Sequence, residues 1–210
     1  NKEYLYYKAI APNIAFIRAT TCDSEGYATF EDEVMYLDAL VIAQAVHNNG
    51  GIVMMQVQKM VKKATLHPKA VRIPGYLVDI VVIDPDQTQL YGGAPVNRFI
   101  SGDFVLDDSQ QTALPLNQRK LVARRALFEM RKGAVGNVGV GIADGIGLVA
   151  REEGCADDFI LTVETGPIGG ITSQGIAFGA NVNTRAILDM TSQFDFYHGG
   201  GLDVCYLSFA

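Results

Sequence analysis

The sequence predicts an α/β fold made of open, mostly parallel sheets covered by helices. Three observations support this prediction. The chain has 210 residues, of which 49% are hydrophobic and 19% charged, so a well-packed globular protein is expected. Short runs of apolar and β-branched residues alternate with segments of helical spacing. The strand runs are continuously apolar rather than alternating, which is typical of parallel sheets that are buried on both faces.

The first half of the chain predicts strand, helix, strand and strand. Residues 13–21 form the first strand. A helix follows, with Thr29 at its N-cap, acidic residues in its first turn and a stop at residues 48–51, Asn-Asn-Gly-Gly. Residues 52–57 and 77–83 read as two further buried strands. Helical spacing predicts that one face of the helix carries Val34, Leu37, Val41 and Ala45.

The second half predicts a new α/β unit. Residues 85–115 lack a helical or sustained alternating pattern, so we expect two domains, over 1–90 and 117–210, with a linker over 91–116. The elements predicted after the linker are a helix from Asn117 to about Lys132, a strand over 136–142, a helix to about Glu153, a strand over 159–163, a helix over 185–191 capped by Thr184, and a strand from Val204.

Glu164 is the candidate catalytic residue. It stands where a buried strand must end, because Thr165, Gly166 and Pro167 force a turn. The carboxyl ends of strands in open α/β sheets are where ligands bind. A glutamate has a reference pKa of about 4.3, so it is an ionised nucleophile at neutral pH without a base to activate it. The alternative reading is an acid that only caps the turn.

Two glycine turns are candidate binding segments. Gly139-Val-Gly141 begins like a dinucleotide fingerprint, but Asp144 occupies the third glycine position, so that reading is weak. A strand, a glycine turn and a helix N-terminus still bring backbone N–H groups together, where they can meet an anion or a carbonyl. The alternative is a tight turn packed on a neighbouring strand. Gly199, Gly200 and Gly201 form either a flexible loop or a backbone surface against a substrate.

Composition argues against several classes of protein. The net charge of −6 disfavours nucleic acid or an anionic membrane as the main partner. No run approaches the roughly 18 apolar residues of a spanning helix. The three histidines are scattered, and no metal site is predicted. The three cysteines lack the spacing of a disulfide framework or a zinc site, which favours a reducing cytoplasm. They are Cys22, Cys155 and Cys205.

Three motifs together carry a resemblance to a known family. Residues 137–142 read Asn-Val-Gly-Val-Gly-Ile, residues 163–170 read Val-Glu-Thr-Gly-Pro-Ile-Gly-Gly, and residues 199–203 read Gly-Gly-Gly-Leu-Asp. This combination resembles the family I CoA-transferases, most closely the single-chain acetate or propionate CoA-transferases of bacteria. The first half is also similar, at residues 17–21 and 74–79. The resemblance therefore covers nearly the whole chain.

The resemblance implies a fold and a set of site residues. It implies two CoA-transferase-type α/β/α domains, each incomplete in this segment, because the chain starts without methionine and ends within an expected strand. Residues 1–90 would be the end of the first domain, and 117–210 the start of the second. Glu164 would be the nucleophile, with Thr165 where relatives often carry Asn or Ser. The segments expected to contact coenzyme A or the acyl group are Val138, Gly139, Val140, Gly141 and Ile142, then Gly166, Gly199, Gly200 and Gly201.

The activity implied is the reversible transfer of coenzyme A between a short-chain acyl-CoA and a free carboxylic acid. It would proceed through an acyl-glutamyl anhydride and a glutamyl-CoA thioester, with coenzyme A as substrate and no permanently bound cofactor or metal. The resemblance also implies a homo-oligomer. Two alternatives stay open, namely a sugar-phosphate isomerase or deaminase, and a non-catalytic acyl-CoA sensor on the same fold. The preferred acid is not readable from the sequence, because one methylene is worth only about 1–3 kcal/mol.

Overall fold

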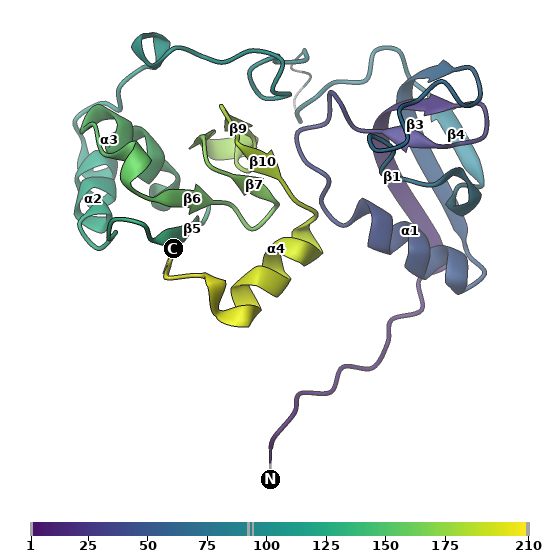
Figure 1. The fold of residues 1–210 in the computed structure, drawn as a ribbon, viewed down its shortest axis with the longest axis horizontal. Helices are drawn as coiled ribbons and strands as arrows, with labels where there is room; N and C mark the ends of the chain where they lie inside the picture. The colour runs from purple at the N-terminus through teal and green to yellow at the C-terminus, as the bar shows by residue number, and fades with distance from the viewer. Residues whose placement is uncertain (1, 92, 94, 209–210) are drawn as a thin grey trace. The chain divides into compact units, whose positions relative to one another are not determined.

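The computed structural model describes residues 2–91, 93 and 95–208. The chain divides into two compact units, drawn in Figure 1. The first unit comprises Asn1–Phe30 and Ala39–Gln87, and the second Glu31–Asp38 and Thr88–Ala210. Each unit has its own sheet with at least one helix, which confirms the predicted α/β class. That the units are the end of one domain and the start of another in a longer protein stays a prediction.

The first unit is built on a four-stranded sheet. Its elements are β1 (Ile14–Asp23), β2 (Ala28–Thr29), α1 (Ala39–Asn48), β3 (Ile52–Val61), η1 (Gly75–Leu77) and β4 (Ile80–Ile83). The strand order is β2–β1–β3–β4. The β1–β3 and β3–β4 pairs are parallel, and β2 is antiparallel to β1. Helix α1 contacts β1 and β3 (Figure 1).

Alternate residues of the two central strands share a buried face. Successive side chains of a strand point to opposite faces of the sheet, so register partners on neighbouring strands lie side by side. The buried pairs are Ala15 with Val53, Ile17 with Met55, and Ala19 with Val57. On the opposite face Phe16 is 79% exposed. The strands predicted over 13–21 and 52–57 are confirmed, and β3 extends further, to Val61.

The helix of this unit starts later than predicted. Thr29 does not cap it, because Thr29 pairs with Thr21 in the antiparallel β1–β2 contact. Leu37 has a φ of 49°, which a helix cannot include, and α1 begins only at Ala39. The predicted apolar face was therefore wrong, and the buried residues of α1 are Ala43 and Val46. The predicted stop is confirmed.

The last strand of the first unit is shorter than predicted. The Asp79 carboxylate accepts a hydrogen bond from the Val53 amide at 2.8 Å, and the Asp79 amide donates to the Val53 carbonyl at 3.0 Å. Residues 75–77 form η1, so regular pairing with β3 covers only β4.

The second unit contains a mixed five-stranded sheet. Its strand order is β10–β7–β6–β5–β11, in which the β6–β5 and β5–β11 pairs are parallel and the β7 pairs antiparallel. A separate antiparallel pair joins β8 to β9. The strands are β5 (Val135–Val138), β6 (Ile160–Thr162), β7 (Pro167–Ile168), β8 (Ile171–Thr172), β9 (Asn181–Val182), β10 (Ala186–Ile187) and β11 (Val204–Tyr206).

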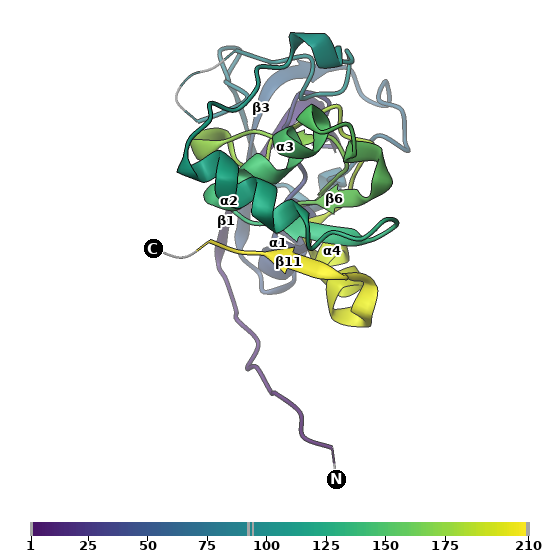
Figure 2. The same ribbon diagram turned by 90° about the vertical axis from the view of Figure 1, so that its left-hand side faces the viewer.

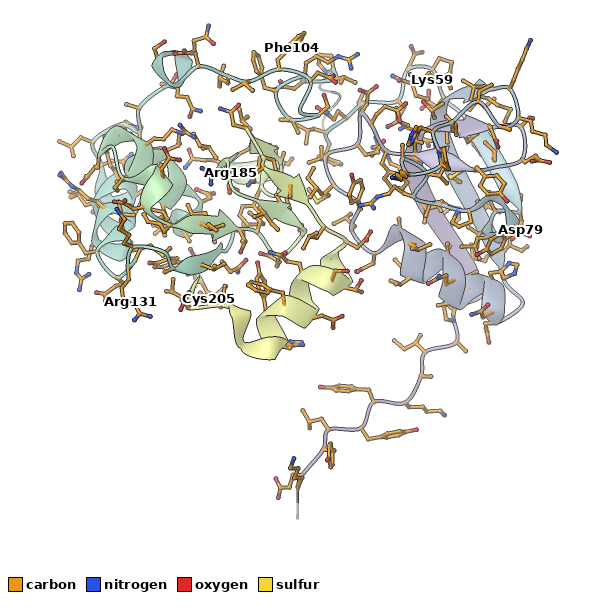
Figure 3. The ribbon with its side chains drawn as sticks, in the orientation of Figure 1. Lys59, Asp79, Phe104, Arg131, Arg185 and Cys205 are labelled. Carbon is orange, nitrogen blue, oxygen red and sulfur yellow. The ribbon has the colours of Figure 1, made fainter. Side chains whose placement is uncertain are left out.

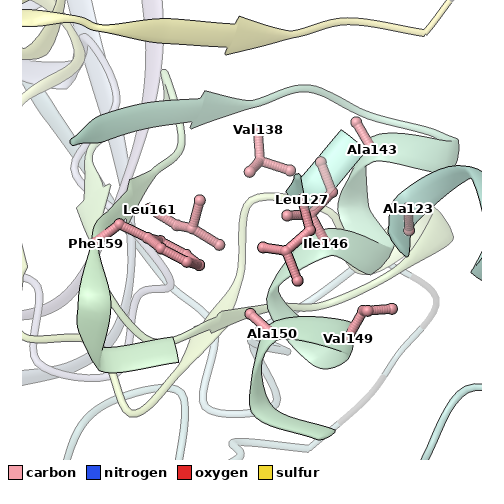
Figure 4. Close-up of a cluster of buried hydrophobic side chains, with 9 residues drawn as sticks. All are labelled: Ala123, Leu127, Val138, Ala143, Ile146, Val149, Ala150, Phe159 and Leu161. Atoms are coloured by element: carbon pink, nitrogen blue, oxygen red, sulfur yellow. The ribbon is translucent and has the colours of Figure 1, made fainter. Parts of the chain in front are cut away.

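Helices α2 and α3 lie side by side in this unit (Figure 2). The helices are α2 (Gln118–Leu127), α3 (Ile146–Glu152), α4 (Met190–Phe196), η2 (Asp108–Gln110), η3 (Ile142–Gly145), η4 (Ala156–Asp158), η5 (Gly175–Ala177) and the π-helical turn η6 (Tyr197–Gly201). Figure 4 shows the apolar cluster that joins them to the sheet, with side chains from β5 and β6 meeting those of α2 and α3. Its members are Ala123, Leu127, Val138, Ala143, Ile146, Val149, Ala150, Phe159 and Leu161. This core fixes the carboxyl ends of β5 and β6.

Two helix predictions of this unit have different outcomes. The side chain of Asn117 accepts a hydrogen bond from the Lys120 amide at 3.2 Å, which confirms the N-cap of α2. The helix predicted over 185–191 is wrong, because Ala186 and Ile187 pair with β7 as strand β10. The helix begins only at Met190. The strand pairing overrides the local helical spacing.

The segment before α2 belongs to the second unit. Its described residues between 91 and 116 contain the short helix η2 but no strand or α-helix. The Asn183 side chain binds both the amide and the carbonyl of Leu106, each at 2.8 Å. This segment is therefore attached to the sheet region next to β9, and its role as an interdomain linker stays a prediction.

Candidate active site

Glu164 lies in a tight turn directly after β6. The Val163 amide donates to the Pro167 carbonyl at 3.0 Å, and the Gly166 amide donates to the Val163 carbonyl at 2.9 Å. Gly166 has a φ of 121°, and a Cβ built on it would lie 2.1 Å from the Leu188 carbonyl oxygen. Only glycine satisfies both conditions. The predicted strand, acid and glycine turn are confirmed as a local structure.

The carboxylate of Glu164 has an unpaired oxygen. Its side chain is half-buried, and Oε2 is buried without a hydrogen-bond partner among the described residues. The hydroxyl of Thr165 is in the same condition. Buried polar atoms are nearly always hydrogen-bonded, so such atoms call for an explanation. A bound substrate that contacts the oxygen would provide one.

Tyr197 is a polar residue close enough to Glu164 for the carboxylate charge to change its pKa. Burial is the main cause that raises the pKa of the Tyr197 hydroxyl, hydrogen bonds with Thr162 and Gln193 lower it, and the negative charge of Glu164 raises it further. The hydroxyl is therefore protonated at neutral pH, and Glu164 lies within electrostatic range of it.

The turn that follows β5 has the predicted strand–glycine–helix layout, but the strand predicted over 136–142 ends at Val138. Gly141 has a φ of 103°, and the turn leads through η3 into α3. The Gly139 amide donates to the Tyr206 carbonyl at 2.8 Å, and the Ile142 amide donates to Ser208 Oγ at 3.0 Å. These two amides already have protein partners. The expected contact of Val138, Gly139, Val140, Gly141 and Ile142 with coenzyme A stays a prediction.

Asp144 anchors this turn, a role that the sequence did not reveal. Its side chain is 0% exposed, and Oδ1 accepts hydrogen bonds from Gln174 Nε2 at 2.9 Å and Arg119 Nη2 at 3.3 Å. The same Arg119 atom donates to the Gly141 carbonyl at 2.8 Å. In the sequence, Asp144 is notable only because it occupies the third glycine position of a dinucleotide-binding motif. Its partners lie 25 and 30 positions away, so no local pattern could have found them.

The triple glycine forms the turn η6 at the end of α4. A Cβ built on Gly199 or Gly200 would meet no atom within 4 Å, whereas one on Gly201 would lie 2.1 Å from the Phe196 ring. Gly200 has a φ of 88°. Open space at Gly199 and Gly200 leaves room for a ligand, and Gly201 is required by packing. Their contact with the acyl group stays a prediction.

The ends of β5 and β6 bring these segments together. Asn137 on β5 and Thr162 on β6 are register partners, and both side chains contact the Tyr197 hydroxyl. Asn137 also reaches Cys205 Sγ on β11 at 3.5 Å, and Figure 3 labels Cys205 there. The strand before Glu164, the turn after β5 and the triple-glycine turn are thus held around one point of the second unit.

One basic side chain of the second unit is already held in an ion pair. Arg185, a possible phosphate ligand by residue type, is labelled in Figure 3 and pairs with Asp157 at 2.8 Å. Among the described residues, no three His, Cys, Asp or Glu side chains are grouped so as to hold a metal ion. None of the helices in the described part of the chain has the length and apolar character to cross a membrane.

Comparison with known proteins shows what this chain is similar to. The family model described as Coenzyme A transferase matches residues 1–84. Acetate CoA-transferase YdiF from Escherichia coli (strain K12) is 96% identical over all 210 residues of the chain. The predicted resemblance to the coenzyme A transferases is confirmed. Caffeate CoA-transferase from Acetobacterium woodii is 40% identical over 211 aligned residues.

Solved structures agree with this family. The acyl-CoA transferase YdiF from Escherichia coli O157:H7, in a thioester complex with CoA, superposes with a TM-score of 0.90 at 91% identity over the whole chain. Its apoenzyme gives the same TM-score at 92% identity. The CoA-transferase fold type is therefore confirmed. The chain spans 40% of the length of the two curated relatives and of the thioester-complex chain.

Proposed function

We propose that the protein containing this chain transfers coenzyme A between a short-chain acyl-CoA and a free carboxylic acid, with Glu164 as the nucleophile. The observation that carries the proposal is the buried, unpaired Oε2 of Glu164 at the end of a buried strand. The near-identical acetate CoA-transferase supports the reaction class. The solved thioester complex of such a relative supports a covalent bond to coenzyme A in the cycle.

The reaction starts from the ionised carboxylate. A Glu164 oxygen attacks the thioester carbonyl carbon of the acyl-CoA, the C–S bond breaks, and coenzyme A leaves as a thiolate, which gives an acyl-glutamyl anhydride. The thiolate then attacks the glutamyl carbonyl carbon. The acyl group leaves as a free carboxylate, and a glutamyl-CoA thioester remains. The acceptor acid runs these two steps in reverse, so no electrons are gained or lost and no metal is needed.

The glycine turns are suited to assist these additions. Each addition puts negative charge on a carbonyl oxygen, and removal of one donor to such an oxygen typically costs about a hundredfold or more in rate. We assign the coenzyme A side to residues 138–142. We assign the acyl side to Gly166 and residues 199–201, since Gly199 and Gly200 leave space at the surface. Water must be excluded, because it would hydrolyse the anhydride.

The remaining expectations describe the setting of the enzyme. Coenzyme A acts as a substrate rather than a resident cofactor, and the partners are an acyl-CoA and a short-chain acid such as acetate. We place the enzyme in the cytoplasm, as the cysteine pattern predicts, and expect a homo-oligomer, as the family resemblance implies.

Mass measurement on the full-length protein tests the proposal. Incubation with acetyl-CoA is expected to add the mass of a CoA thioester to the peptide that contains Glu164. Glu164→Gln keeps the shape but loses the nucleophile, so both adduct and turnover should disappear. Glu129→Gln is the matched control, because Glu129 is an exposed side chain that pairs with Arg125.

The same experiment distinguishes the alternatives. An acyl-CoA sensor would bind acetyl-CoA without any covalent adduct. An isomerase or deaminase would give no adduct and would turn over a sugar phosphate instead. Full activity of Glu164→Gln, or an adduct on another peptide, would refute the role of Glu164.

A further inference from the structure

The Tyr197 hydroxyl is the meeting point of three side chains from different elements. It lies 2.6 Å from Thr162 Oγ1 at the end of β6, and it accepts a hydrogen bond from Gln193 Nε2 of α4 at 2.8 Å. It donates to Asn137 Oδ1 of β5 at 3.1 Å. A hydroxyl carries one proton and accepts up to two hydrogen bonds. Thr162 Oγ1 also donates to the Gly136 carbonyl at 3.0 Å, so the Tyr197 proton is shared between Thr162 and Asn137 while Gln193 donates to Tyr197.

Each of these contacts is next to a segment of the candidate site. Thr162 is two residues before Glu164, and Asn137 directly precedes the turn over 138–142. Tyr197 itself is two residues before Gly199. One oxygen atom therefore connects the nucleophile, the assigned coenzyme A side and the assigned acyl side.

The three side chains that contact the Tyr197 hydroxyl are buried, so water from the solvent cannot take its place as their hydrogen-bond partner. Thr162 is 2% exposed, Asn137 is 5% exposed and Gln193 is 1% exposed. Oε1 of Gln193 is already buried without a partner among the described residues. Loss of the Tyr197 hydroxyl would also remove the hydrogen-bond acceptor of Gln193 Nε2. A buried polar side chain without a partner shifts to regain hydrogen bonds, and the strand or helix that bears it shifts too.

We propose that Tyr197 is a positioning residue for the transferase reaction, which holds the Glu164-bearing end of β6 against the end of β5 and the triple-glycine turn through its hydroxyl. This inference rests on the proposed function. Tyr197 acts through Thr162 and Asn137 rather than on the substrate. Its loss should therefore slow the attack of Glu164 while substrate affinity is kept.

The test compares single-turnover rates of adduct formation on Glu164 in full-length variants. Tyr197→Phe and Thr162→Val remove one hydroxyl each, and we expect adduct formation to slow by about tenfold to a hundredfold, as misplaced reacting groups do. The KM for acetyl-CoA should stay within about twofold, because Asp144 and Arg119 still anchor the turn over 138–142. Thr162→Ser restores the hydroxyl and should restore the rate.

Tyr206→Phe is the matched control. The Tyr206 hydroxyl donates to the Ala126 carbonyl at 3.1 Å, in the same unit but on the side of α2. Its loss should leave the adduct rate unchanged.

Three results would overturn the inference. The first is that Tyr197→Phe and Thr162→Val form the adduct as fast as Tyr206→Phe. A slow Thr162→Ser would also do so, because the hydroxyl would then not be the cause. A raised KM with an unchanged adduct rate would place Tyr197 in binding instead. If the wild-type protein forms no adduct at all, the proposed function itself fails, whereas a wild-type adduct with a normal Tyr197→Phe rate overturns only the inference.

Discussion

At the scale of single residues, the account depends on the state of one carboxylate. An attacking carboxylate oxygen is a better nucleophile without strong hydrogen bonds, because each such bond stabilises the negative charge that the attack uses. Oε2 of Glu164 meets this condition within the described residues, and it is buried, which limits solvation by water. The turn that holds it needs glycine at position 166.

Gly166→Ala should destabilise the protein severely. Alanine would have to adopt a φ of 121° and place its Cβ 2.1 Å from the Leu188 carbonyl oxygen. We expect a loss of at least about 2 kcal/mol, seen as a lower Tm of the full-length protein. Gly133→Ala is the control, because Gly133 also has a positive φ of 79° but open space around it. Equal losses for the two variants would contradict the packing argument.

The pKa of Tyr197 predicts a stability change at alkaline pH. Burial raises this pKa above the ordinary value of 10.0, so the folded state keeps a proton that the unfolded state loses. The stabilisation is complete below pH 10 and is lost as the pH rises through the folded pKa. The Tm of the wild-type protein should therefore fall more steeply above pH 10 than that of Tyr197→Phe. Parallel curves would show that Tyr197 is not perturbed.

The sequence could predict Glu164 but not its surroundings. A buried strand followed by an acid and a glycine turn is a local pattern. Tyr197 meets Thr162 and Asn137 across 35 and 60 positions of the sequence, so only the folded sheet brings them together. Asp144 belongs to the same class of missed residues.

At the scale of elements, the N-cap of α2 is a local feature whose contribution to helix stability can be measured. Asn117→Ala removes the acceptor for the Lys120 amide, and we expect the helix to lose about 1 kcal/mol of local stability. Faster hydrogen exchange of the peptide over residues 118–127 would report this loss. Asn117→Ser keeps a side-chain acceptor and should exchange like the wild type. If both variants exchange equally fast, the cap is not the cause.

The turn after β5 offers a test of the coenzyme A side. Asp144→Ala removes the acceptor that Arg119 and Gln174 share, so the turn over 138–142 loses its anchor. We expect a several-fold higher KM for acetyl-CoA in steady-state kinetics. Asp107→Ala is the control, because Asp107 is exposed and accepts hydrogen bonds only from nearby Ser109 in the described contacts. An unchanged KM for Asp144→Ala would remove this turn from the binding site.

Some elements were predictable because their signals are local. The Asn117 cap and the strand over 159–163 depend on neighbours in the sequence, and both are found. The helix predicted from Thr29 and the one predicted over 185–191 failed for a different reason. In each case a strand pairing is stronger than the local helical spacing: Thr29 pairs with Thr21, 8 positions away, and residues 186–187 pair with β7.

At the scale of the whole molecule, this chain corresponds to only part of the length of its relatives. It covers 40% of the length of the acetate CoA-transferase to which it is 96% identical. Glu164, the proposed nucleophile, and the two glycine turns all lie in the second unit. Activity measurements therefore belong to the full-length protein.

The exchange of oxygen between acid and enzyme tests the central claim most directly. Full-length protein is turned over with acetyl-CoA and acetate labelled with ¹⁸O in both oxygens. In the proposed cycle the acceptor leaves one of its oxygens on the glutamate, so the Glu164 peptide should gain about 2 Da in the first turnover and a further increment in later ones. Label-free Glu164 after many turnovers would contradict attack by this carboxylate.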